Sequence, residues 1–284
     1  MKINIRVAAL AAVAAAAIAA PAIASHSWST YHWQRTSAEI SPPVITAIDQ
    51  TKWGTYVVNA VGDWNGQDPD QTPYISYIES PGPTASGLNP KTCKAQSGKI
   101  LVCNARYGFT GWLGIAQIWL SGGHIVQGIT KLNDSYFDTA TYNKPEWRAL
   151  VACQEIGHDY GLGHQDEDFN NADVEQPAGS QSCMDYTNQP LGNETPNGHD
   201  YEQLAIMYSH SHSNFTAVGP GRSNSGTGLN NASGGDSPSE WGRAVHFDAQ
   251  GRPDYFMMDL GGGKRKLTHV FWTLEAKAGG HHGH

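Results

Sequence analysis

The chain has 284 residues, a net charge of −8 and 39% hydrophobic residues, so it can bury the core of one large or two modest domains, which excludes a disordered chain. Acidic residues outnumber basic ones by 26 to 18, which excludes a nucleic-acid binder because such proteins neutralise phosphates with Lys and Arg. The charged fraction of 15% lies below the roughly 25% of an average soluble protein and favours the uncharged, loop-rich surface of an extracellular protein.

Residues 1–24 have the pattern of a secretory signal peptide. Lys2 and Arg6 form a basic start, 8–20 an apolar run, and 22–24 a small-x-small cleavage site. The apolar run is shorter than the roughly 20 residues that span a membrane. The sequence therefore predicts a secreted protein, cleaved near residue 24, with no membrane partner. An exported chain with four cysteines is expected to form two disulfides, and the sequence alone allows three pairings.

Apolar spacing predicts the elements of the first domain in chain order. A helix is expected over about 52–66, where large side chains recur at the spacing of a helix buried on one side. Strands are expected at 74–78, 100–105, 112–120 and 124–132, the last two flanking a tight hairpin turn at 121–123. The sequence therefore predicts a small sheet with helices beside it.

Two further helices complete this domain. One is expected from near Asn143 to residue 160, with Pro145 in its first turn, where the missing N–H costs nothing. Gly161 is a good terminator for this helix. The other is expected over about 200–209, with Asp200 as its N-cap.

The composition changes after residue 210. Residues 211–238 are dominated by Gly, Ser and Asn, which is typical of a flexible linker. Three short strands follow within 239–276, and we expect them to form a small β meander that is too small to be stable alone. The predicted domains are therefore the main domain at 25–210, the linker, a small β appendage at 239–276 and a flexible His-rich tail at 277–284.

The stretch 154–164 carries the chemistry. Gln154 and His158 are four residues apart, so their side chains share one helix face, with Glu155 at its edge. A positive φ at Gly161 would let the chain reverse and bring His164 toward His158 from another direction, as a tetrahedral metal requires. Glu155 would then accept a proton from water beside the metal. A pair of satisfied polar histidines at a helix end is the alternative interpretation.

This stretch resembles the metzincin metallopeptidases, whose pattern is H-E-x-x-H-x-x-G-x-x-H followed by a Met-turn. Four positions match, namely Glu155, His158, Gly161 and His164, and residues 182–186 resemble the Met-turn. The resemblance covers roughly 26–210. It implies an α+β metzincin fold with a small twisted mixed sheet, an active-site helix, one catalytic zinc ion and peptide-bond hydrolysis.

The resemblance also implies roles for residues of the Met-turn and for the cysteines. Met184 would form an apolar floor under the metal, and Tyr186 would approach the metal and stabilise the tetrahedral intermediate. The Met-turn beneath the helix would bring Cys183 close to Cys153. The second disulfide would then join Cys93 and Cys103. An extended substrate would pair with an edge strand above the cleft, for which 113–120 is the candidate.

The sequence departs from the family pattern at Gln154, which stands where the family has its first histidine. A glutamine amide oxygen is a poor donor for zinc, which prefers imidazole, thiolate or carboxylate. Three interpretations remain open. Gln154 binds the metal through Oε1, another group such as Tyr186 replaces it, or the site has lost its metal.

Two functions follow from these residues. The first is a secreted zinc-dependent endopeptidase acting on a peptide or protein substrate, with Glu155 and Tyr186 as catalytic residues and His158, His164 and Gln154 as metal ligands. The second is a secreted binding or scaffold protein that keeps the fold and has lost catalysis. Acidic side chains over 166–173 also suggest calcium, although they lack the Gly and Glu positions of an EF-hand loop. The oligomeric state is left open.

Overall fold

The structure is a computed structural model that describes residues 26–34, 42–65, 87–168, 181–209, 229 and 231–277. The predicted signal peptide, the strand predicted at 74–78 and the tail from 278 lie outside these residues. Within the described part of the chain, no helix has the length and the apolar character needed to cross a membrane.

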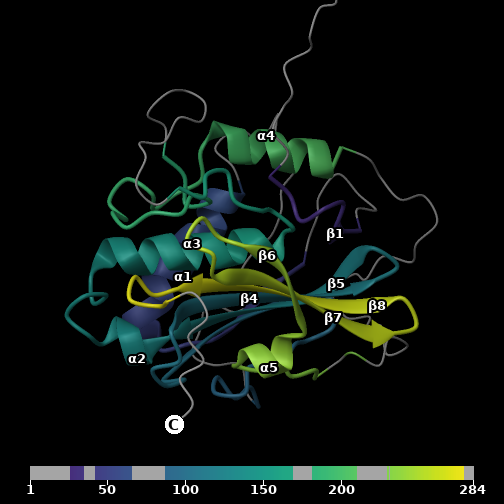
Figure 1. The fold of residues 1–284 in the computed structure, drawn as a ribbon, viewed down its shortest axis with the longest axis horizontal. Helices are drawn as coiled ribbons and strands as arrows, with labels where there is room; N and C mark the ends of the chain where they lie inside the picture. The colour runs from purple at the N-terminus through teal and green to yellow at the C-terminus, as the bar shows by residue number, and fades with distance from the viewer. Residues whose placement is uncertain are drawn as a thin grey trace, which may run out of the picture.

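A mixed eight-stranded sheet forms the centre of an α+β fold (Figure 1). Its strands are β1 (His32–Trp33), β2 (Val44–Ala47), β3 (Ile100–Ala105), β4 (Trp112–Ser121), β5 (His124–Asn133), β6 (Arg243–Phe247), β7 (Pro253–Gly261) and β8 (Lys264–Trp272). The order across the sheet is β2-β3-β5-β4-β8-β7-β6, and β1 pairs with β5. β2, β3 and β5 run parallel, whereas the remaining pairs of this order are antiparallel. The central strands are covered on both faces, which explains their nearly continuous apolar sequences.

Five helices pack around this sheet, namely α1 (Gln50–Trp64), α2 (Asp134–Phe137), α3 (Pro145–Asp159), α4 (Gly198–Met207) and α5 (Pro238–Trp241). Figure 1 shows α1 and α3 over one face of the sheet and α5 at the opposite face. The largest buried cluster lies under α1 and α3. Two indole groups join α1 to its neighbouring helices, because Trp53 Nε1 donates to Asp134 Oδ1 of α2 (2.8 Å) and Trp64 Nε1 donates to the carbonyl of Cys153 in α3 (2.9 Å).

The predicted helices form, and capping residues determine where two of them begin. α1 begins two residues before the predicted start because the Asp49 side chain accepts from the backbone N–H of Thr51. α4 begins at Gly198 because Asn197 is the N-cap. The prediction that Asp200 is the N-cap is therefore wrong, and Asp200 instead closes a capping box from the third helical position.

The hairpin and the disulfides follow the sequence predictions. Ser121 pairs with His124 across a two-residue turn in which both glycines have positive φ, as the favoured hairpin turns require. Cys93 bonds to Cys103, and Cys153 bonds to Cys183. Two disulfides agree with the redox environment of a secreted protein.

The C-terminal strands depart from the predicted appendage. β8 pairs antiparallel with β4 over its whole length, from Trp112 opposite Trp272 to Ser121 opposite Lys264. β6, β7 and β8 therefore extend the main sheet, because a three-stranded meander cannot bury a core of its own and the side of β4 offers unpaired backbone groups. The described end of the predicted linker is also packed, since Gln117 Nε2 donates to the carbonyl of Gly234 (2.8 Å).

This pairing corrects a second expectation. The sequence marks 113–120 as an edge strand that could pair with substrate, but β4 lies between β5 and β8 and is hydrogen-bonded on both sides. The chain itself therefore fills the position that substrate was expected to take.

The packing of α3 predicts that replacing a helix glycine with alanine, which usually stabilises a protein, destabilises this protein at Gly157. A Cβ added at Gly157 would lie 2.5 Å from Trp64 Cζ2 and 2.7 Å from Met184 Sδ. We expect Gly157→Ala to lower the free energy of unfolding by about 1–3 kcal/mol through overpacking. Gly62 lies at an exposed position of α1, and nothing lies within 4 Å of an added Cβ there. Gly62→Ala should therefore raise the free energy of unfolding by about 0.5–1 kcal/mol. Urea unfolding of both variants measures the difference, and a stabilising Gly157→Ala would contradict the described packing.

Candidate metal centre

Two histidines from the predicted motif meet at the end of α3. His158 Nε2 and His164 Nε2 are 3.2 Å apart, close to the roughly 3.3 Å between two nitrogens that bind one tetrahedral zinc at 2.0–2.1 Å. His158 Nδ1 lies 2.8 Å from the carbonyl oxygen of Leu162. Donation from Nδ1 to this carbonyl leaves the Nε2 lone pair directed at His164, as in metal-binding histidines.

The loop after α3 returns His164 to the helix. Gly161 has a φ of +97°, as the sequence predicts for the reversal. The loop is held by the first described segment of the chain, because Gly163 N donates to the carbonyl of His26 and Trp28 N donates to the carbonyl of Gly161. The Trp28 indole stacks on the His158 ring with centroids 5.0 Å apart. The N-terminal segment therefore covers the helix end and excludes water from it.

A third histidine, which the sequence analysis missed, joins the pair from β8. One ring nitrogen from each of His158, His164 and His269 lies within 4.8 Å of the other two. The three residues are buried. Burial lowers the pKa of His158 and of His164 well below the usual range, and it lowers the pKa of His269 to about 3. All three imidazoles are therefore neutral near pH 7, the form that binds metals.

Glu155 contacts the histidine cluster through His269. Its Oε2 lies 2.9 Å from His269 Nδ1, and the residue is fully buried. Burial raises the pKa of the Glu155 carboxyl well above its usual range, against a smaller opposing effect of the Ala116 backbone. The helix can approach β4 this closely because Gly114 has no side chain, and an added Cβ would lie 2.8 Å from Glu155 Cγ.

Gln154 has a structural role that the sequence did not reveal. Its Nε2 donates to the carbonyls of Cys183 (2.7 Å) and Asp185 (3.1 Å). Its Oε1 has no hydrogen-bond partner among the described residues. The side chain thus anchors the Met-turn to α3, beside the Cys153–Cys183 disulfide.

The Met-turn lies against α3. Met184 is fully buried, and its Sδ lies where a side chain at Gly157 would be. The Ser182 hydroxyl donates to Asp200 Oδ2 (2.5 Å) of α4, and Asp185 Oδ2 accepts from the backbone of Ser182 (2.9 Å). The turn is therefore held in place by α3 and α4.

Tyr186 lies beside the cluster but is held by an acid of β7. Its hydroxyl donates to Asp254 Oδ2 (2.6 Å) and lies 3.4 Å from His269 Nε2. Asp254 Oδ1 accepts from His246 Nδ1 (2.8 Å). Tyr255 places its hydroxyl 3.0 Å from His164 Nδ1. β7 and β8 therefore supply the polar groups that orient the imidazoles.

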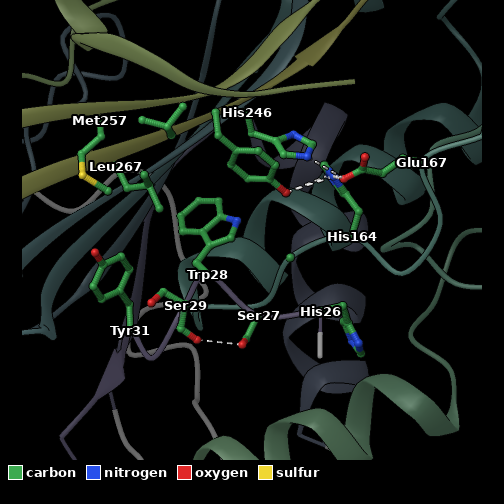
Figure 2. Close-up of a pocket in the computed structure, with 13 residues that line it drawn as sticks. His26, Ser27, Trp28, Ser29, Tyr31, His164, Glu167, His246, Met257 and Leu267 are labelled. Carbon is green, nitrogen blue, oxygen red and sulfur yellow. Dashed lines mark hydrogen bonds and ion pairs between the residues drawn. The ribbon is translucent and has the colours of Figure 1, made fainter. Parts of the chain in front are cut away.

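A cavity of about 350 Å³ adjoins the cluster at His164. Figure 2 shows Trp28 at its centre, with His164, Glu167 and His246 grouped on one side and Met257 and Leu267 on the other. Glu167 Oε1 lies 3.7 Å from His164 Nδ1 and 3.5 Å from His246 Nε2. Within the described part of the acidic stretch, Glu167 thus faces histidines, while Asp166 accepts from the backbone of Asp168.

No family model matches the chain, and no curated protein matches it significantly. The site itself must therefore indicate the chemistry. Three neutral, buried imidazoles lie close enough together to hold one metal ion, and the buried carboxyl groups of Glu155 and Asp254 lie beside them. The sequence signal for His269 was weak, because only its position between Leu267 and Phe271 on one strand face placed it with buried residues.

The anchoring role of Gln154 predicts a loss of stability in its absence. Gln154→Leu would leave the carbonyls of Cys183 and Asp185 buried without this donor, and an unsatisfied buried polar group costs about 1–3 kcal/mol. We expect a decrease of that size in the free energy of unfolding of the metal-free protein. Chemical denaturation with both disulfides intact measures it, and an unchanged midpoint would show that Gln154 does not hold the Met-turn.

Proposed function

We propose that this protein binds one zinc ion through His158, His164 and His269 and that the site has the chemistry of a secreted zinc-dependent peptidase. The observation that carries the proposal is the convergence of three buried imidazoles from a helix, a loop and a strand. Such ligands do not lie on one line, which suits a tetrahedral ion. His269 thereby replaces the histidine that is missing at position 154.

The electrostatics of the site support a bound cation. Burying a carboxylate without a compensating charge is unfavourable, and Glu155 is buried beside imidazoles whose pKa values are lowered. A divalent cation between the imidazoles would favour the ionised form of Glu155 and oppose the rise in its pKa that burial causes. The contact between Glu155 and His269 Nδ1 would then orient a metal ligand, as carboxylates commonly do behind metal-binding histidines.

The residues have the following roles under this proposal. Zinc, when bound, polarises a scissile carbonyl and acidifies water. Once released from His269 Nδ1, Glu155 would accept the proton of the attacking water and pass it to the leaving amine, as the metzincin resemblance implies. Trp28 and Tyr255 exclude water from the imidazoles, and Tyr255 and Leu162 orient His164 and His158. Met184 and the Cys153–Cys183 disulfide support α3 from below.

One observation favours the second function, a binding or scaffold protein. Glu155 is fully buried and contacts His269, so in the described form it is not free to contact a substrate water. A carboxylate held in this way behind a metal ligand would orient the imidazole and would not act as a base. The two functions share the metal and differ in whether the Glu155 carboxyl is released from His269 Nδ1 to contact a water.

The ligand set predicts metal content. Purified mature chain should contain about one zinc ion, and His269→Ala should weaken zinc binding by more than the 10–100-fold that loss of an outer-shell partner costs. His124→Ala is the matched control, because this histidine of β5 lies against His32 and outside the three-histidine cluster. Competition with a chromophoric chelator measures both. Equal zinc affinity of His269→Ala and the parent would contradict the proposed site.

Glu155 can be tested separately. Glu155→Gln keeps size and removes the base, so zinc should remain bound while chelator-sensitive peptide hydrolysis falls by about 10²–10⁴-fold. Initial rates on a mixture of quenched fluorescent peptides measure this. Equal rates in parent and variant would remove Glu155 from the mechanism, and absence of hydrolysis by the zinc-loaded parent would favour the binding function.

A further inference from the structure

A second group of possible metal ligands lies beside the His164 ring. One side-chain ligand atom from each of His164, Glu167 and Asp254 lies within 4.8 Å of the other two. His164 Nδ1 is 3.7 Å from Glu167 Oε1, which is less than twice the roughly 2.0–2.2 Å bond from zinc to nitrogen or oxygen. His164 Nε2 lies 3.2 Å from His158 Nε2. The two ring nitrogens of His164 therefore have different neighbours, His158 at Nε2 and the Glu167 carboxyl at Nδ1.

Asp254 of β7 is held in place by two hydrogen bonds. It is fully buried, its Oδ2 accepts from the Tyr186 hydroxyl (2.6 Å), and its Oδ1 accepts from His246 Nδ1 (2.8 Å). Carboxylates that bind metals are oriented by outer hydrogen bonds of this kind. Because the two oxygens of a carboxylate offer about four acceptor positions, these two bonds leave positions for a metal.

The charges around this group favour a cation. Among the described residues, no lysine or arginine forms an ion pair with Glu167 or Asp254, and the basic groups that face them are the imidazoles of His164 and His246. A buried carboxylate such as Asp254 is unfavourable without a compensating charge, which a divalent cation supplies. Protonated His246 is the alternative source of that charge. The two alternatives differ in metal content, which can be measured.

We propose that His164, Glu167 and Asp254 bind a second metal ion, for which zinc is the best fit. One imidazole with two carboxylates is a set of zinc ligands, whereas Ca²⁺ and Mg²⁺ take oxygen ligands. His164 would bind the first ion through Nε2 and the second through Nδ1. The Nδ1 proton would then pass to solvent, and the contact between Nδ1 and the Tyr255 hydroxyl would be lost. The inference goes beyond the proposed function, because Glu167 and Asp254 are not ligands of the three-histidine site.

The second ion would be reached from the cavity. Figure 2 shows His164, Glu167 and His246 grouped on one side of it. The Glu167 side chain is 37% exposed, whereas His158 and His269 are fully buried. Water and chelators should therefore reach the second ion more easily than the first. The second ion should bind more weakly and be lost during purification, so that the purified chain retains the first ion alone.

The test measures the zinc that depends on Glu167. The metal-free mature chain is dialysed to equilibrium against buffers of increasing free zinc, and elemental analysis gives the zinc bound per chain. The parent should bind one ion more at saturation than Glu167→Gln. Asp168→Asn is the matched control, because it removes an exposed carboxylate of the same loop, and it should bind as much zinc as the parent. The His-rich tail is present in every variant, so zinc bound there cancels in these differences.

Two further variants separate this site from the first. His269→Ala should weaken binding of the first ion and keep the Glu167-dependent ion. His164→Ala should weaken binding of both, because it removes the shared imidazole, and a Glu167-dependent ion that it leaves unchanged would overturn the ligand set. A missing first ion contradicts the proposed function, whereas a missing Glu167-dependent ion contradicts this inference.

A second substitution guards against effects on folding. Asp254→Asn repeats the test from β7, and intact disulfides with a cooperative melting transition establish that each metal-free variant is folded. Equal zinc in the parent, Glu167→Gln and Asp254→Asn would overturn the second site and leave protonated His246 as the compensating charge. An equal loss of zinc in Asp168→Asn would also overturn it, because the ion would then respond to net charge alone.

Discussion

The pairing of β8 with β4 is the interaction on which the candidate site depends. It brings His269 to His158 and His164, places Glu155 beside a partner and joins the C-terminal strands to the main sheet. Each contact is long-range, since more than a hundred residues separate Glu155 from His269. Without this pairing the helix would present two histidines and a carboxylate at an open face, with Gln154 turned to the Met-turn.

Close packing explains how the three histidines and Glu155 can be buried together. Gly114 and Gly157 let β4, Trp64 and Met184 approach α3 at distances that a methyl group would prevent. The Cys153–Cys183 disulfide and the two hydrogen bonds of Gln154 hold the Met-turn in place. Burial then keeps the imidazoles neutral and makes an isolated carboxylate unfavourable, conditions under which a divalent cation stabilises the folded state.

The sequence predicts the local features well. The periodicity of 52–66, the Pro145 start, the double-glycine hairpin and the left-handed Gly161 are each determined by residues close in sequence, and the structure confirms them. Two helix starts differ from the predicted ones by about two residues, because the side chains of Asp49 and Asn197 cap the helices there.

The sequence does not predict the features that depend on which strands pair. Three short strands after a Gly-rich stretch fit a separate meander as well as an extension of the sheet, because period-2 alternation does not identify a partner. Consequently the sequence predicts β4 as an edge strand, and it offers Gln154 or Tyr186 as the third metal ligand. His269 had only the signal of a polar residue on an apolar strand face, where a buried structural histidine is an equally good interpretation.

The most direct test of the ligand set is X-ray absorption at the zinc edge of the zinc-loaded mature chain. The account predicts three imidazole nitrogens at about 2.0–2.1 Å from the metal, and the loss of one of them in His269→Ala. Two imidazoles in the parent, or the same number in parent and variant, would show that β8 does not contribute a ligand and would contradict the central claim.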